Sequence, residues 1–206
     1  MVEPYLRRSP LAHFGLSARA AAQVAAVQDA EILLGERPHR CQINLRGNAA
    51  DAAFLDAVRQ AAGLSLPTEP NRVARGGEIR ALWLGPSEWL LVGPVGREAD
   101  LARSLRSSLA GQHAAVTDVS EARTCILVGG SKARELLAKG CSLDLHPRAF
   151  GPGGCAQSGM VGANIILEQI DERPTFEIAV LNSFADHLWR WLERASAGFK
   201  VAVLGD

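Results

Sequence analysis

The residue types best suited to chemistry gather in residues 139–155. Cys141, Asp144, His146 and Arg148 follow one another closely there. A carboxylate and an imidazole on the same side of an extended chain, with a thiol nearby, could form a proton-transfer pair or hold a metal ion. A zinc or iron centre usually needs three or four protein ligands, however, and the other histidines show no ligand spacing. We therefore predict that Asp144, His146 and Arg148 pin a long loop through hydrogen bonds to backbone groups.

The cysteines do not support nucleophilic catalysis. Cys141 follows the predicted end of a helix, where the helix dipole disfavours a thiolate, and Cys125 lies in an apolar strand that belongs in a core. The four cysteines contain no C-x-x-C pair, which is typical of reduced thiols in a cytosolic protein. No G-x-S-x-G sequence is present, so a serine hydrolase has no support.

Two glycine clusters fall short of nucleotide-binding motifs. Residues 129–132 read Gly-Gly-Ser-Lys between a predicted strand and helix, but their spacing does not match the G-x-x-x-x-G-K-[ST] pattern of a P-loop. Residues 151–154 fail the dinucleotide pattern because Ala156 occupies the position of the last glycine. Both clusters are expected to form turns and helix entries.

Charge and hydropathy exclude further classes. The 22 basic residues balance the 22 acidic ones, which gives no net attraction to nucleic acid or anionic lipid. No apolar run reaches the ~18 residues of a membrane span. Arg7 and Arg8 suggest a twin-arginine export signal, but Pro10 and His13 directly behind them argue against it. We expect a cytoplasmic protein.

The first half of the chain predicts strands that alternate with helices. Cys41, Ile43 and Leu45 share one face of a strand, and Asn48 with Asp51 opens a helix. The expected elements are a strand at 41–46, a helix closed by Gly63, a turn-rich loop at 67–77, strands at 79–84 and 88–92, a helix closed by Gly111 and a strand at 114–119. This β-α-β-β-α-β order is that of a ferredoxin-like unit.

A similar order recurs in the second half. Its expected elements are a strand at 124–128, a helix at 131–139 closed by Gly140, two strands within 163–180, a helix at 183–194 and a strand at 201–204. Ser183 and Asp186 form a variant of the capping box for the last helix. The core stripe of that helix is predicted to be Phe184, Leu188, Trp191, Leu192 and Ala195.

The fold class that follows is α+β, with duplicated ferredoxin-like units packed as one body. Residues 1–28 are predicted to form an N-terminal arm that stays mobile unless a partner holds it. Residues 29–120 and 121–206 are predicted to be the two units.

The tryptophans are candidate interface residues, because tryptophan is often an anchor of protein interfaces. Trp83 and Trp89 flank a predicted hairpin turn, Trp191 belongs to the core stripe, and Trp189 lies at its edge. Partial burial in this chain is the alternative reading. Exposure of Trp189 would mark it as a subunit contact.

Three segments together resemble the gamma subunit of heterotetrameric sarcosine oxidases. Residues 7–13 read Arg-Arg-Ser-Pro-Leu-Ala-His, and residues 82–92 read Leu-Trp-Leu-Gly-Pro-Ser-Glu-Trp-Leu-Leu-Val. Residues 139–150 form the third segment, which closes with Cys-Ala-Gln at 155–157. Thr-Asp-Val-Ser at 117–120, followed by Arg123, stands between them in the expected order. The resemblance therefore extends over nearly the whole chain.

This resemblance implies a fold like that of the folate-binding aminomethyltransferase family and a place in an oxidoreductase complex acting on CH–NH donors. The complex would demethylate sarcosine to glycine, transfer the one-carbon unit to tetrahydrofolate and form hydrogen peroxide. FAD, FMN, NAD and tetrahydrofolate would belong to the alpha and beta subunits, and zinc to the delta subunit. This chain would carry no catalytic residue, cofactor or metal. Its candidate structural or interface residues are Arg8, Trp83, Trp89, Cys141, Asp144, His146, Arg148 and Trp189.

Two alternatives stay open at this point. A stand-alone folate-binding protein of the aminomethyltransferase type would need an aromatic clamp and a carboxylate, for which Asp118 and Asp144 are candidates. A gamma-like subunit of an N-methylglutamate dehydrogenase-type complex would show the same sequence features, since substrate contacts would lie on other chains.

Overall fold

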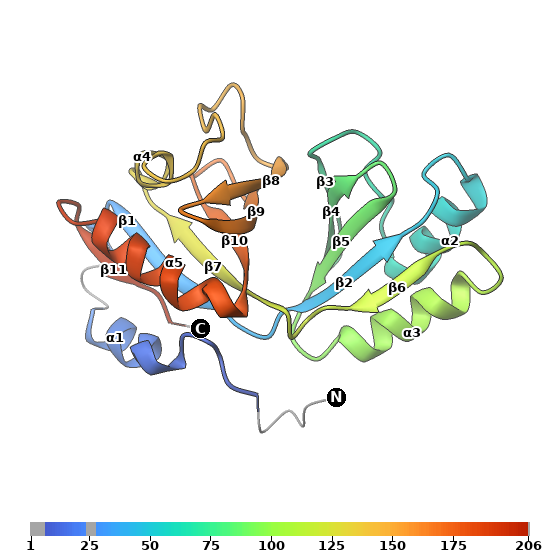
Figure 1. The fold of residues 1–206 in the computed structure, drawn as a ribbon, viewed down its shortest axis with the longest axis horizontal. Helices are drawn as coiled ribbons and strands as arrows, with labels where there is room; N and C mark the ends of the chain where they lie inside the picture. Colours follow the sequence, from blue (N-terminus) through green and yellow to red (C-terminus); the bar gives the residue numbers. More distant parts are fainter. Residues whose placement is uncertain (1–6, 24–27, 206) are drawn as a thin grey trace. The chain divides into compact units, whose positions relative to one another are not determined.

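The computed structural model describes residues 7–23 and 28–205, and these form two compact units. Unit 1 comprises residues 1–39, 121–152 and 157–206, as far as they are described. Unit 2 comprises residues 40–120 and 153–156. The chain is a mixed α+β protein with two sheets (Figure 1). No helix in the described part is long and apolar enough to cross a bilayer.

Unit 2 is a five-stranded sheet with two helices on one face. Its strands lie in the order β3-β4-β5-β2-β6, and each neighbouring pair is antiparallel. The elements are β2 (Cys41–Arg46), α2 (Ala52–Ala62), β3 (Val73–Gly76), β4 (Ile79–Gly85), β5 (Glu88–Gly93), α3 (Glu98–Ser108) and β6 (Ala115–Asp118). Alternate strand residues face α2 and α3 and build the core, as the period of two predicts. Cys41, Ile43, Leu45, Ala81 and Leu91 are fully buried there.

Helix α2 shows how local sequence sets these boundaries. Asp51 is its N-cap, and the carboxylate accepts a hydrogen bond from the amide of Ala53 at 2.9 Å. Asn48, predicted to share this role, instead accepts a bond from the amide of Ala50 in the preceding turn. Gly63 ends the helix with a φ of 71°, a left-handed conformation that favours glycine.

Unit 1 is built on a six-stranded sheet in the order β11-β1-β7-β10-β9-β8. Helix α5 packs against β7 and β10 (Figure 1). The elements are η2 (Ala12–Phe14), α1 (Leu16–Ala22), β1 (Ile32–Arg37), β7 (Arg123–Gly129), α4 (Ala133–Ala138), β8 (Cys155–Met160), β9 (Ala163–Gln169), β10 (Phe176–Leu181), α5 (Asn182–Ala195) and β11 (Val201–Val203). Strand β1 is antiparallel to β7 and parallel to β11.

The sequence analysis did not predict three of these strands. Strand β1 pairs with β7, so residues 29–39 lie in unit 1 and not with residues 40–120. Strand β3 has only four residues and lies in the segment predicted as a loop. Strand β8 consists mostly of small and polar residues, which have low strand propensity.

Helix α5 differs from its prediction in two respects. Its N-cap is Leu181, with no side-chain cap, so Ser183 and Asp186 do not form a capping box. The buried stripe contains Ala185, Leu188, Trp189 and Leu192, whereas Phe184 is 40% exposed and Trp191 is half-buried. The stripe is therefore rotated toward Trp189.

The described part of the N-terminal arm packs on unit 1. Leu11 is completely buried and Leu16 is 8% exposed. Gln23 accepts a hydrogen bond from the amide of Val203 in β11 at 3.0 Å. Residues 7–23 are thus held by their own chain, without the partner that the sequence analysis required. Residues 1–6 and 24–27 of the predicted arm lie outside the described residues.

Candidate functional site: an anchored loop and a latched arm

The α4–β8 loop, here residues 140–152, is the segment in which the sequence gathers reactive side chains. Its inner side is held by Arg134 of α4. The guanidinium donates to the carbonyl oxygens of Leu145 and Phe150, the latter at 3.0 Å, and to the side-chain oxygen of Gln169 at 2.8 Å. It also lies over the ring of Phe176, 5.3 Å from the centroid. Burial lowers the pKa of Arg134 from its ordinary value because desolvation disfavours the charged form.

Apolar contacts complete this inner side. Leu145 and Phe150 are 5% and 8% exposed. The ring of Phe150 stacks on that of Phe176 with a centroid distance of 6.3 Å. The loop is therefore fixed by one partly buried cation and two buried apolar side chains.

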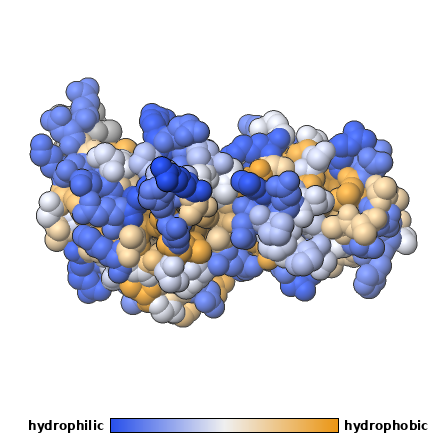
Figure 2. Space-filling model, turned by 90° about the horizontal axis from the view of Figure 1, so that it is seen from above, coloured by the Kyte–Doolittle hydropathy of each residue, from blue (hydrophilic) through white to orange (hydrophobic). Residues whose placement is uncertain are grey.

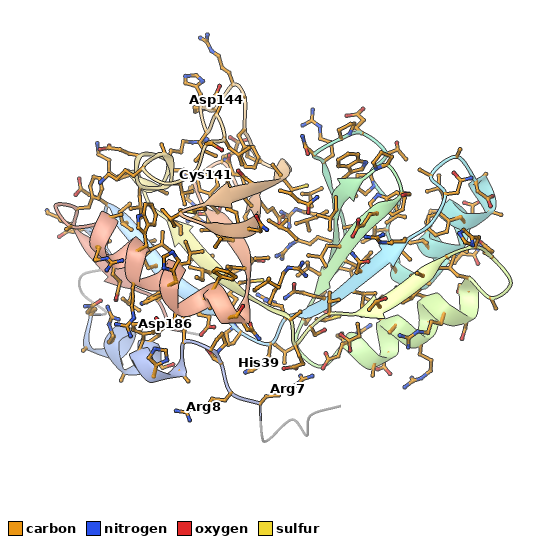
Figure 3. All side chains as sticks on the ribbon, viewed as in Figure 1. Arg7, Arg8, His39, Cys141, Asp144 and Asp186 are labelled. Carbon is orange, nitrogen blue, oxygen red and sulfur yellow. The ribbon has the colours of Figure 1, made fainter. Side chains whose placement is uncertain are left out.

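The outer turn of the loop carries the polar side chains that could do chemistry. Asp144 accepts a bond from the amide of His146 at 2.9 Å, and Nδ1 of His146 accepts one from the amide of Arg148 at 3.2 Å. These bonds agree with the prediction that Asp144 and His146 pin the loop, whereas the guanidinium of Arg148 makes no such bond within the described residues. All three side chains are exposed. Figure 3 shows Asp144 on the outer turn and Cys141 at the base of the loop.

The exposed side chains of the α4–β8 loop include several polar ones. Hydrophilic residues are interspersed with apolar ones on the molecular surface seen from above (Figure 2). Ser142, Asp144, His146 and Arg148 belong to the exposed residues of the loop. The loop therefore presents a polar surface to its surroundings.

The described residues contain no group of three or more His, Cys, Asp or Glu side chains that could hold a metal ion. Asp118 and Asp144, the two carboxylates considered for folate, both bind their own turns. Asp118 accepts bonds from the amide and the hydroxyl of Ser120 at 3.0 and 2.6 Å. Burial raises the pKa of the Cys41 thiol to about 12, and Cys141 is 7% exposed, so neither thiol is presented as a nucleophile.

The tryptophans divide into buried and half-buried residues. Trp89 is fully buried, and its Nε1–H donates to the carbonyl oxygen of Pro67 at 2.8 Å. Trp189 is also fully buried, so the condition set for a subunit contact is not met. Trp83 is half-buried and packs against the core of unit 2.

The arm explains the burial of Trp189. Phe14 lies over it with a ring-centroid distance of 6.0 Å, and Arg190 lies over Phe14. His13 Nε2 and Asp186 Oδ1 are 2.6 Å apart, and Asp186 also accepts a bond from Arg190 at 2.8 Å. The bonds from Arg190, and then from His13, hold the pKa of Asp186 below its ordinary value.

Further polar contacts bind both ends of the arm to the rest of unit 1. Arg7 pairs with Glu121 at 2.8 Å, and Arg19 pairs with Glu193 at 2.7 Å. The hydroxyl of Ser9 donates to the buried carboxylate of Glu36. Arg8, next to them, is exposed and extends from the outer side of the arm (Figure 3).

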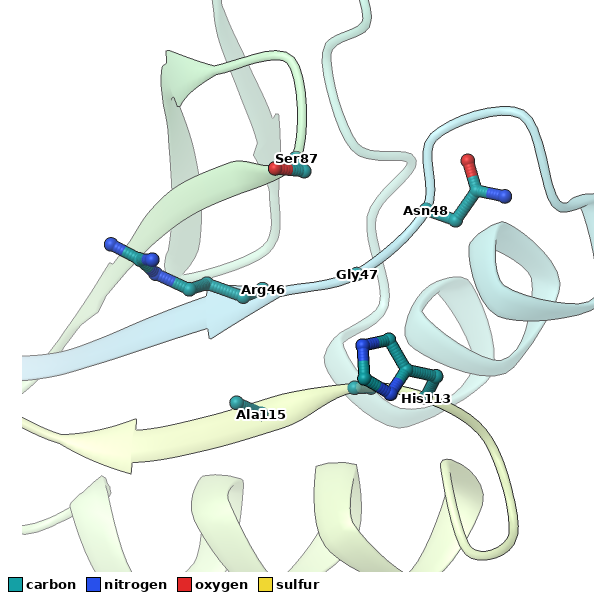
Figure 4. A pocket seen from close by; sticks show the side chains of 7 residues that line it. Arg46, Gly47, Asn48, Ser87, His113 and Ala115 are labelled. Carbon is teal, nitrogen blue, oxygen red and sulfur yellow. The ribbon is translucent and has the colours of Figure 1, made fainter.

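Unit 2 has a hollow of about 460 Å³ where β2 ends and β5 and β6 begin. The sequence analysis did not predict this hollow, which is lined by Arg46, Gly47, Asn48, Ser87, His113, Ala114 and Ala115. The side chains of Arg46 and Asn48 point away from each other (Figure 4), and Arg46 already binds Glu88 at 2.9 Å. The polar groups of the hollow therefore do not converge on a single point.

Arg134, Leu11 and Phe14 organise these segments and were missed by sequence reasoning. An arginine in a helix is ordinarily solvated, so nothing marks Arg134 as an anchor. For the arm, the one signal in the sequence is that Leu11 and Phe14 lie three positions apart, a spacing that indicates an apolar face.

Comparison with solved structures first identifies the fold. The glycine cleavage system aminomethyltransferase T from Bartonella henselae aligns with a TM-score of 0.64 at 19% identity, over 85% of this chain and 48% of that one. This two-sheet α+β fold is therefore shared with an aminomethyltransferase.

Further comparisons identify the family. The profile of the sarcosine oxidase, gamma subunit family matches residues 46–198. Sarcosine oxidase subunit gamma of Corynebacterium sp. (strain P-1) is 32% identical over 94% of this chain and 92% of its own, and that of Arthrobacter sp. is 33% identical with the same coverage. A chain of the heterotetrameric sarcosine oxidase from Corynebacterium sp. U-96, in complex with pyrrole 2-carboxylate, aligns with a TM-score of 0.82 at 31% identity, over 97% and 99% of the two chains. The chain belongs to the sarcosine oxidase gamma subunit family.

Proposed function

We propose that this chain is the non-catalytic gamma subunit of a heterotetrameric sarcosine oxidase. The observation that carries the proposal is the match, over almost the full length of both chains, to a chain of such a complex. The side chains of Asp144 and His146 in the α4–β8 loop bind backbone amides of their own loop, which supports a structural role.

In this proposal the assembly demethylates sarcosine to glycine, with one-carbon transfer to tetrahydrofolate and formation of hydrogen peroxide in the cytoplasm. The partners are alpha, beta and delta subunits. FAD, FMN, NAD and tetrahydrofolate belong to partner chains, and zinc belongs to delta.

The proposed contact residues follow from exposure. Arg8, Asp144, His146 and Arg148 are exposed, and Trp83 is half-buried, so these side chains are available to a partner. Trp89, Trp189 and Cys141 are buried in this chain and act as structural residues.

We also propose that the two units are a duplication of one ferredoxin-like unit. The order β6-β2-β5-β4 in unit 2 is the 4-1-3-2 strand order of a β-α-β-β-α-β unit. In unit 1 the equivalent order would be β11-β7-β10-β9, and β1 is inserted between β11 and β7.

The proposal is tested by co-expressing this chain, with an affinity tag, together with the reading frames for a flavoprotein subunit, a large folate-domain subunit and a small cysteine-rich subunit. We expect a yellow complex on the affinity resin, whereas the chain expressed alone aggregates or is colourless. The matched control is the same co-expression with the tag on an unrelated protein of similar size. A well-behaved monomer that leaves the other three subunits in the flow-through would refute the proposal.

A further inference from the structure

We propose that residues 144–149 of the α4–β8 loop form a preordered docking turn, which binds a carboxylate on a neighbouring subunit through Arg148 and is positioned by Arg134. This inference rests on the proposed function, since it requires that the chain belongs to an assembly. It adds the chemistry of the contact and the residue that sets its geometry.

The inner side of the turn is held in place by contacts within this chain, without a partner. Arg134 donates to the carbonyl oxygen of Leu145, within the turn, and to that of Phe150, directly after it. Gln169 and Phe176 hold the same guanidinium from the other side. One nitrogen of the partly buried guanidinium therefore joins the two carbonyl oxygens and fixes the path of the turn between them.

The outer side is ordered by a continuous set of hydrogen bonds. Asp144 accepts from the amide of His146, and His146 Nδ1 accepts from the amide of Arg148. The amides of Ala149 and Phe150 donate to the carbonyl oxygen of His146 at 2.8 and 2.9 Å. A segment that is already ordered loses little conformational freedom on binding, which is the usual source of affinity in preorganised contacts.

Arg148 is the side chain that this ordered turn offers to a partner. It is exposed, and its guanidinium has no hydrogen-bond or ion-pair partner among residues 7–23 and 28–205. The carboxylate of Asp144 is occupied by the turn itself. Arginine binds carboxylates through two parallel hydrogen bonds and is enriched in the energetically important positions of interfaces. The fitting partner surface therefore carries an Asp or Glu side chain.

The first test is charge reversal in the assembled protein. Arg148→Glu should weaken the affinity of the chain for its other subunits by at least about tenfold, measured by biolayer interferometry at moderate salt. The matched control is Arg173→Glu, because Arg173 is an exposed loop arginine of unit 1 whose ion pair, with Asp171, is at 3.6 Å. This control should change the affinity less than about twofold.

The second test addresses positioning. Arg134→Met should increase hydrogen exchange at the amides of His146, Arg148, Ala149 and Phe150 and weaken association. Arg134→Lys should not restore either, because a lysine ammonium lacks the second, coplanar nitrogen that binds Gln169 while Nη1 binds the two carbonyl oxygens. In the Arg134→Met background, Arg148→Glu should cost much less affinity than in the wild type. A purely structural role for Arg134 would give additive losses.

The outcomes separate the two proposals. If the wild-type chain does not bind the other subunits, the proposed function fails. If it binds them and Arg148→Glu binds equally well, the docking turn alone is refuted. Equal losses from Arg148→Glu in both backgrounds would refute the positioning role of Arg134, and Arg148→Glu remains informative even where the Arg134 variants fold poorly.

Discussion

The sharpest stability prediction concerns the arm, which the sequence indicated to be mobile and the structure shows to be packed. We expect Leu11→Ala to release residues 7–23 from unit 1. Leu11 is completely buried, although it lies close to the N-terminus. Burying a leucine side chain contributes about 1.5–3 kcal/mol, and Leu→Ala in a rigid core costs about 2.7–5 kcal/mol.

A surface segment can partly close the cavity, so a cost of about 2–3 kcal/mol is expected for Leu11→Ala. Since 1.36 kcal/mol corresponds to a factor of ten, local opening of the arm should become roughly 30- to 150-fold more frequent. Hydrogen exchange followed by mass spectrometry measures the frequency of this opening directly. The amides of Phe14 and Arg19 donate within the arm at 2.9 and 3.0 Å and are suitable reporters.

Ser17→Ala is the matched control, because Ser17 is an exposed residue of α1. It should change exchange by no more than about twofold, in keeping with surface substitutions. If Leu11→Ala left the exchange of the arm within this same range, the argument that the arm is part of the folded body would be refuted.

Three further predictions concern other parts of the chain. Gly47→Ala should lower the free energy of unfolding, measured in urea, by about 1–3 kcal/mol, because the new Cβ would lie 2.2 Å from the ring of Phe54 in α2. Gly159→Ala is the control and should leave the free energy of unfolding unchanged, because its new Cβ would have no atom within 4 Å. Because the hydrogen bond from Arg190 depresses the pKa of Asp186, the stabilisation by this carboxylate is complete above its ordinary pKa of 3.8. It is lost as pH falls through the lower folded value, and Asp186→Asn should remove this pH dependence of arm exchange. Cys41, with its pKa of about 12, should resist alkylation at roughly pH 8 in the native chain and react in urea, as mass spectrometry would show.

The apolar periodicity predicted those helices and strands whose pairing or packing involves residues close to them in the sequence. The hairpin of β4 and β5 was read correctly because apolar residues run on both sides of the Gly-Pro-Ser turn. Helix α5 was also placed within a residue or so, but the sequence could not show which side of it is covered. Phe14 from the arm lies over Trp189, and this contact between distant residues rotates the buried stripe away from Phe184.

The candidate site was predicted only in part. Asp144 and His146 do bind backbone amides of their loop, as their polar character indicated. Arg134 could not be predicted, because its partners are carbonyl oxygens whose positions depend on the folded path of the loop. Strand β1 was missed for a related reason, since its pairing with β7 joins residues from opposite halves of the chain.

The central claim is that this chain completes an assembly and contributes no catalytic group. It is tested most directly by following sarcosine-dependent hydrogen peroxide formation with the purified chain alone and with the complete assembly. We predict no turnover by the chain alone and turnover by the assembly. Sarcosine oxidation by the purified chain, with no other subunit present, would contradict the claim.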